Sequence, residues 1–164
     1  MKKSLFSLIL TAVLIAVGAV PAHAVAVESA ASASRLEEAK KYYIASAVDG
    51  LPVVQKFNGQ TFTAAQIESA RKAITGWCNA EFEPFLRRSG ILDEWIEMQF
   101  DAQIREFNRR LVNAENPEQF MKIAAEANVF IRKNYPNTDT KLKTPDGIKV
   151  MQKLQLALLE AILK

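Results

Sequence analysis

The strongest constraint on the fold is the recurrence of apolar side chains at intervals of three and four residues. Residues 91–113 show it most clearly, because one slowly drifting helical face carries Leu92, Ile96, Phe100, Phe107 and Leu111. No stretch alternates apolar and polar residues convincingly, as a half-buried strand would. The sequence therefore predicts an all-α domain, folded as a single irregular bundle of about five or six helices.

Capping residues set the expected helix boundaries in the first half of this bundle. Two capping boxes, each a Ser or Thr followed three residues later by Glu or Gln, start helices at Ser34 and Thr63. Residues 51–60 have the composition of a turn-bearing connector. Gly76 and Pro84 interrupt the next helical pattern, so a separate short helix is expected around Pro84.

Prolines mark the boundaries in the second half. The Asn-Pro pair at 116 and the Thr-Pro pair at 144 each place a capping residue before a proline in the first helical position. The Tyr-Pro pair at 135 ends the helix that begins at 116. The long pattern from Ile91 to Asn113 has no internal breaker, and one continuous helix is expected there.

The first 24 residues have the layout of a cleavable secretory signal peptide. Lys2 and Lys3 precede an apolar run over residues 5–17, and Ala22 and Ala24 are small residues before the expected cut. An uncleaved membrane anchor is the alternative, but the run is shorter than the roughly 20 residues that span a bilayer.

We therefore divide the chain into a signal peptide (residues 1–24), a flexible leader (residues 25–34) and a helical domain (residues 35–164). The expected location is the periplasm, with secretion as the alternative. No transmembrane segment is expected after cleavage.

Cleavage would remove His23, the only histidine in the sequence. The remaining 140 residues would then lack the base of Ser-His-Asp and Cys-His nucleophile pairs, and any histidine ligand for zinc or haem. Loss of Lys2 and Lys3 lowers Lys and Arg from 21 to 19 against 18 acidic residues, so the net charge falls from +3 to +1. A charge this close to zero argues against a nucleic-acid partner.

Two groups of residues remain as candidates for chemistry. Cys78, the only cysteine, is open to three interpretations: a buried apolar residue, a reactive or intermolecular thiol, and a catalytic thiolate. Glu94, Glu97 and Asp101 share helical spacing and could act as paired carboxylates, although acidic residues also stabilise the start of a helix. We favour the structural interpretation in both cases, and predict no catalytic, cofactor-binding or metal-ligating residue.

The last helix, from residue 145 onward, is apolar around most of its circumference. Its polar residues Lys149, Lys153, Glu160 and Lys164 occupy a narrow strip. A helix of this kind lies either in the core or against a partner, and both interpretations stay open. The predicted partner-binding residues are Trp95, Met98, Gln99, Phe100, Met151, Gln152, Gln155 and Leu159.

Two short motifs resemble known families of exported helical proteins. The segment FTAAQ, residues 62–66, is similar to the Leu-Thr-x-x-Gln motif of the Spy-like and CpxP-like periplasmic stress chaperones, and NPEQF at 116–120 is a partial echo of it. This resemblance implies a helical protein that shields unfolding clients. The Thr-Pro-x-Gly turn at 144–147 and Lys153 resemble the tail of an uncharacterised family of exported helical proteins, which implies no activity.

These features together predict a non-enzymatic exported protein that acts by binding another protein. The partner would be an envelope or secreted protein, or a second copy in a dimer. A chaperone-like holdase is the first alternative. A hydrolase that uses the carboxylates of Glu94, Glu97 and Asp101 is the second.

Overall fold

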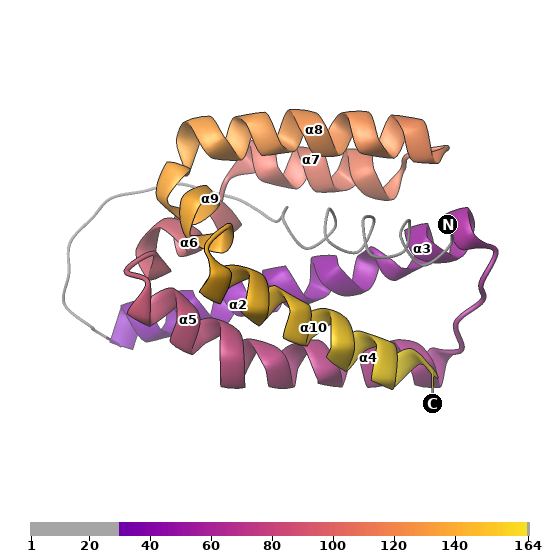
Figure 1. Cartoon of the computed structure of the whole chain (residues 1–164), viewed down its shortest axis with the longest axis horizontal. Coiled ribbons are helices and arrows are strands. Elements are labelled where there is room, and N and C mark those ends of the chain that lie inside the picture. Colours follow the sequence, from indigo (N-terminus) through magenta and orange to yellow (C-terminus); the bar gives the residue numbers. More distant parts are fainter. Residues whose placement is uncertain (1–29, 164) are drawn as a thin grey trace.

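The computed structural model describes residues 30–163, and these residues form helices with no strand among them (Figure 1). In chain order the elements are α2 (Ala30–Asp49), α3 (Leu51–Asn58), α4 (Ala64–Trp77), the π-helical turn η1 (Cys78–Phe82), α5 (Glu83–Arg88), α6 (Leu92–Gln99), α7 (Ala102–Val112), α8 (Pro117–Asn134), α9 (Pro136–Leu142) and α10 (Pro145–Leu163). The predicted all-α bundle is confirmed over this range, with more and shorter helices than expected. The expected signal peptide and residues 25–29 of the expected leader lie outside the described residues.

Helices α2 and α3 follow one another with only Gly50 between them, where the sequence predicted a connector. α2 begins at Ala30, within the expected leader, so Ser34 lies inside the helix instead of capping it. α3 forms because three of its aliphatic side chains are buried, and burial of apolar area outweighs the weak helix propensity of the segment. It ends at Gly59, whose positive φ of 66° suits a helix terminus.

The predicted break at Gly76 and Pro84 does not occur, and α4, η1 and α5 form one helical rod from residue 64 to residue 88 (Figure 1). The π-helical turn explains this continuity. In it the N–H of Glu83 donates to the carbonyl of Cys78, five residues back instead of four. Pro84, which has no N–H to offer, follows in the first turn of α5, where none is needed.

The single helix predicted over residues 91–113 is wrong, because the chain breaks between α6 and α7. Asp101 has extended backbone angles and caps α7, its carboxylate accepting the N–H of Gln103 at 2.8 Å. Its second carboxylate oxygen accepts the hydroxyl of Tyr135, which follows α8. A capping residue with a tertiary partner therefore outweighs the helical periodicity of this segment.

Two arginines near the end of α7 form ion pairs. Arg109 pairs with Glu106 at 2.6 Å, whereas Arg110 reaches Glu126 on α8 at 2.7 Å. One of these contacts is local to α7 and the other joins α7 to α8. Such exposed pairs each contribute only about 0.2–1 kcal/mol.

The aromatic core is centred on Phe82, in the π-helical turn. Its ring centroid lies 4.7 Å from that of Trp77, 5.4 Å from Trp95, 5.5 Å from Tyr43 and 6.2 Å from Phe85. All five side chains are buried. Because they come from α2, α4, η1, α5 and α6, this one cluster joins the N-terminal helix to the middle of the chain.

A buried lysine also ties α2 to α5. Lys40 is 7 % exposed, and its Nζ donates to Glu37 at 2.7 Å and to Glu83 at 2.9 Å. Burial acts to lower the pKa of Lys40, but the bonds to the two carboxylates outweigh it and raise that pKa. The ammonium group therefore stays charged and paired inside the fold.

Helices α7 and α8 lie side by side, at the top of Figure 1 and away from α4 and α10. Two contacts join this pair of helices to α3. Lys56 of α3 donates to the carbonyl of Ala114, between α7 and α8, at 2.8 Å. The rings of Phe57 on α3 and Phe120 on α8 are 6.0 Å apart. Asn116 caps α8 as predicted, accepting the N–H of Gln119 at 2.8 Å.

Truncation of Phe82 to alanine should destabilise the whole domain. The ring contacts four other aromatic side chains, so Phe82→Ala is expected to lower the free energy of unfolding by about 3–5 kcal/mol. Urea titration followed by tryptophan fluorescence measures this change. Val129→Ala is the control, because that side chain is 63 % exposed and should change the same free energy by less than about 0.5 kcal/mol.

Candidate functional site

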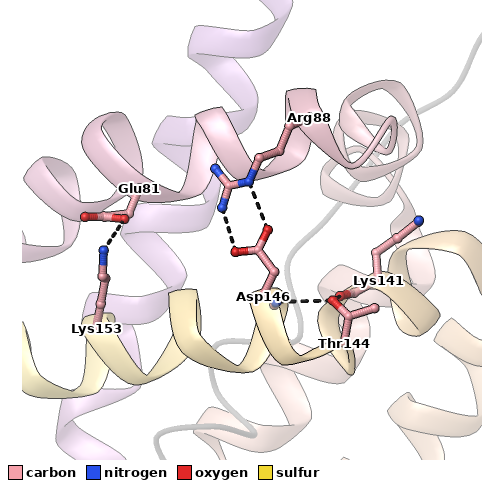
Figure 2. A network of polar contacts seen from close by, with 7 residues as sticks. Glu81, Arg88, Lys141, Thr144, Asp146 and Lys153 are labelled. Atoms are coloured by element: carbon pink, nitrogen blue, oxygen red, sulfur yellow. Dashed lines mark hydrogen bonds and ion pairs between the residues drawn. The ribbon is translucent and has the colours of Figure 1, made fainter.

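Helix α10 starts against the end of α9, at the Thr-Pro-x-Gly turn. The Oγ1 of Thr144 donates to the carbonyl of Lys141 at 2.6 Å and accepts the N–H of Gly147 at 3.2 Å (Figure 2). A Cβ on Gly147 would lie 2.7 Å from the carbonyl oxygen of Leu142 and closer still to that of Lys141. Glycine is therefore needed where α10 approaches the α9 backbone, which gives the motif a structural role.

The inner face of α10 packs antiparallel on the rod of α4, η1 and α5. Buried Trp77 donates its indole N–H to the carbonyl of Val150 at 2.8 Å. At the start of α10, Arg88 holds Asp146 through two bonds of 2.9 Å each (Figure 2). The buried side chains of α10 face the rod; they are Val150, Leu154, Leu158 and Ile162.

The far end of α10 is held by the FTAAQ segment. Thr63 and Gln66 form the predicted capping box, with reciprocal bonds of 3.1 Å and 2.9 Å. The Nε2 of the same Gln66 donates to the carbonyl of Ile162 at 2.8 Å. The glutamine thus caps α4 and also satisfies a terminal carbonyl of α10.

The outer face of α10 carries an apolar stripe that faces solvent. Ile148 is 47 % exposed, Leu156 61 %, Leu159 36 % and Leu163 78 %. Gln152 is exposed and Gln155 is half-buried on the same face. These side chains recur every three or four residues, so they line one side of the helix. We call these six residues the α10 stripe: Ile148, Gln152, Gln155, Leu156, Leu159 and Leu163.

One edge of the α10 stripe is charged. Lys149, Lys153 and Glu160 are all exposed along it, as the narrow polar strip predicted. Lys153 also reaches Glu81 in η1 at 2.8 Å (Figure 2). The two lysines stand toward the N-terminal end of the edge, and the glutamate stands toward its C-terminal end.

The structure places the predicted partner-binding residues of α10 at or beside this stripe. Gln152 and Leu159 are exposed, whereas Gln155 and Met151 are half-buried, with Met151 packed against the core. The partner-binding residues predicted from the sequence did not include three members of the stripe, which are Ile148, Leu156 and Leu163. A helical projection of the sequence places these residues in the apolar part of the last helix. Only the position of the rod of α4, η1 and α5 shows which side of α10 faces solvent.

The other predicted stretch, Trp95 to Phe100, does not form a surface. Trp95, Met98 and Gln99 are each no more than 3 % exposed. Phe100 is half-buried against Tyr42, at a ring distance of 5.5 Å. The prediction that these four residues bind a partner is therefore wrong. The chain breaks after α6, and the side chains of Trp95, Met98 and Gln99 are packed in the core.

The acidic cluster serves helix packing. Glu94 accepts both the backbone N–H and the hydroxyl of Thr138, at 2.6 Å and 2.9 Å, and so joins α6 to α9. Glu97 pairs with Arg35 on α2 at 3.0 Å. Asp101 caps α7, as described above. The three carboxylates therefore bind three different elements instead of converging on one point.

Cys78 is 1 % exposed, as the first of its three interpretations requires. Burial raises the pKa of its thiol from the ordinary value of 9.0 to about 12, against a smaller opposing effect of the Lys40 charge. The neutral thiol is the form present at physiological pH, and it is a poor nucleophile.

The buried thiol leads to a prediction for alkylation. At pH 8.5, iodoacetamide should modify Cys78 of the folded protein about 100-fold more slowly than in urea, because thiolate is scarce and access requires opening of the fold. The unfolded thiol ionises near pH 9 and the folded thiol near 12, so this group makes the free energy of unfolding fall as the pH rises across that interval. Equal alkylation rates, measured by mass spectrometry, would contradict the burial.

A cavity is also present among the described residues. It has a volume of about 250 Å³, lies between the end of α2 and α7, and is lined by Ser46, Asp49, Asn108, Arg109, Leu111, Val112 and Asn113. Within residues 30–163, no group of three or more His, Cys, Asp or Glu side chains is placed to hold a metal ion. Among the helices described, none combines the length and apolarity required to cross a bilayer.

Comparison of the chain with protein-family models, curated proteins and solved structures gives no match. The two resemblances drawn from short motifs therefore stay predictions.

Proposed function

We propose that this chain is an exported helical protein without enzymatic activity, and that it acts by binding another protein through the α10 stripe. The observation that carries this proposal is the set of four exposed aliphatic side chains on one face of α10. Contiguous exposed apolar surface marks interaction sites, and an amphipathic helix is a recurrent way to present it.

The anchoring of α10 supports the same proposal. Contacts from Arg88 and Trp77 hold its first two turns, and a contact from Gln66 holds its end. The stripe is therefore presented by a rigid element, and a partner that binds it does not have to order the helix first. Preorganisation of this kind favours affinity because less conformational entropy is lost on binding.

The side chains most suited to chemistry support a role without catalysis. Cys78 is buried, and Glu94, Glu97 and Asp101 each bind a partner on another element or cap a helix. A carboxylate hydrolase would need two of these groups to face a substrate in one cleft. The geometry gives that alternative little support.

The holdase alternative also has less support than the binding of a specific partner. The Gln66 side chain of the chaperone-like motif bonds within the chain, at Thr63 and Ile162. The exposed aliphatic residues of α10 form a single narrow stripe. A protein that shields varied unfolded clients requires a broader or more adaptable apolar surface.

A photo-crosslinker at Leu156 tests the proposal directly. Residues 25–164 with benzoylphenylalanine at position 156 should form an adduct of defined mass with one envelope protein or with a second copy. The matched control carries the same group at Val129 on α8, because the two side chains are 61 % and 63 % exposed. Identical adducts at both positions, or none at either, would contradict the proposal. Many adducts of different mass at position 156 would favour the holdase.

Export has its own test. The full chain, expressed with a C-terminal tag in a bacterium with two membranes, should appear in the osmotic-shock fluid with Val25 as its first residue. Ala24→Arg should leave the longer precursor in the cells, since signal peptidase requires a small residue before the cut. A soluble cytoplasmic product that starts at Met1 would contradict this location.

A further inference from the structure

We infer that a second copy of this chain occupies the α10 stripe, with the two α10 helices antiparallel about a two-fold axis near Gln155 and Leu156. This inference rests on the proposed function, because it names the partner of the same surface. In Figure 1, α10 lies at the front of the molecule, and no other described helix covers its outer face.

The stripe is symmetric about its own midpoint. From Ile148 to Leu163 it spans 15 residue steps, or about 22 Å of helix. When a second α10 runs in the opposite direction about the midpoint, Ile148 lies opposite the partner's Leu163, and Gln152 lies opposite the partner's Leu159. Each exposed aliphatic side chain then meets the partner's stripe over its whole length, as an isologous interface requires.

The charged edge is self-complementary in this arrangement. A two-fold axis perpendicular to antiparallel helices brings the same edge of each helix together, in opposite order. The partner's Glu160 then lies level with residue 151, between Lys149 and Lys153. Symmetry repeats this contact, so each glutamate is bracketed by two lysines.

Two of these three charged groups make no hydrogen bond or ion pair among the residues that the structure describes: Lys149, whose charge helps to lower the pKa of Asp146, and Glu160. Lys153 bonds to Glu81. An antiparallel second copy would therefore supply both with an opposite charge at the rim of an apolar strip.

A parallel pair does not give this match. Its two-fold axis runs along the helices and places the charged edge of one α10 beside the opposite edge of the other, where Met151 and Gln155 stand. Lys149 and Glu160 would then gain no oppositely charged neighbour. The order of charges thus favours the antiparallel direction.

The expected complex is weak. Two single helices bury less surface than the roughly 1,600 Å² of a standard interface, so the dissociation constant should lie at about 1–100 μM. Sedimentation equilibrium of residues 25–164 over that concentration range should show a monomer and dimer in exchange. A protein that stays monomeric throughout would overturn the inference.

Engineered cysteines test the direction of the helices. Under mild oxidation, Leu156→Cys should crosslink to its own copy, since it lies at the axis. Gln152→Cys and Leu159→Cys should each remain uncrosslinked alone, because the two copies of either residue are about 10 Å apart along the helix. A mixture of these two variants should crosslink. The unmodified chain is the control, because its Cys78 is buried. Crosslinking of each variant with itself alone would overturn the antiparallel arrangement.

Charge reversal tests the edge. Glu160→Lys should raise the dissociation constant about three- to tenfold, and adding Lys149→Glu should restore most of the affinity. Glu118→Lys on α8 makes the same change in net charge and should leave dimerisation unchanged. Equal weakening by both single variants would mean that net charge alone acts, and would overturn the edge contact.

The outcomes separate this inference from the proposed function. A monomer whose Leu156 crosslinks to a different protein would overturn the second copy as partner and leave the proposed function supported. A monomer whose Leu156 crosslinks to nothing would overturn both. Large open assemblies that disappear with Val129→Glu would mean that the stripe binds α8 of another copy, and would overturn the two-fold pairing.

Discussion

The antiparallel contact between α10 and the rod of α4, η1 and α5 is the packing on which the rest of the structure depends. It is secured by side-chain contacts along its length, from Arg88 with Asp146 to Gln66 with the carbonyl of Ile162. These partners are between 58 and 96 residues apart in the chain. The contact therefore closes the fold, because it holds the last helix against an early one.

The π-helical turn gives this rod its continuity. A break at Pro84 would separate α5 from α4, and Arg88 and Trp77 would no longer stand on one straight surface facing α10. The turn instead absorbs the missing N–H of the proline and also brings Phe82 into the aromatic core. One local irregularity thus supports both the core and the seat of the last helix.

The same packing explains why the chemically promising residues of this chain are structural. Glu94 accepts a hydrogen bond from α9, and Asp101, at the break between α6 and α7, accepts one from Tyr135. Lys40 is paired with Glu83 inside the fold. Lys40 is buried and the carboxylates of Glu94 and Asp101 are half-buried, and polar groups in such positions require hydrogen bonds within the protein. The exposed aliphatic side chains on the outer face of α10 have no such internal role.

Local chemistry in the sequence was enough to determine the helical class and several boundaries. Thr63 with Gln66, Asn116 and the Thr-Pro pair at 144 start helices where capping rules place them, because those rules depend only on neighbouring residues. Tertiary contacts decided the rest. The helix expected over residues 91–113 is interrupted at Asp101, whose carboxylate accepts the hydroxyl of Tyr135. The helix that contains Pro84 is continuous because a π-helical turn precedes the proline. Periodicity showed that α10 is apolar nearly all round, but only the position of the rod decided that Val150 is buried and Leu156 exposed, since burial depends on which face meets another helix.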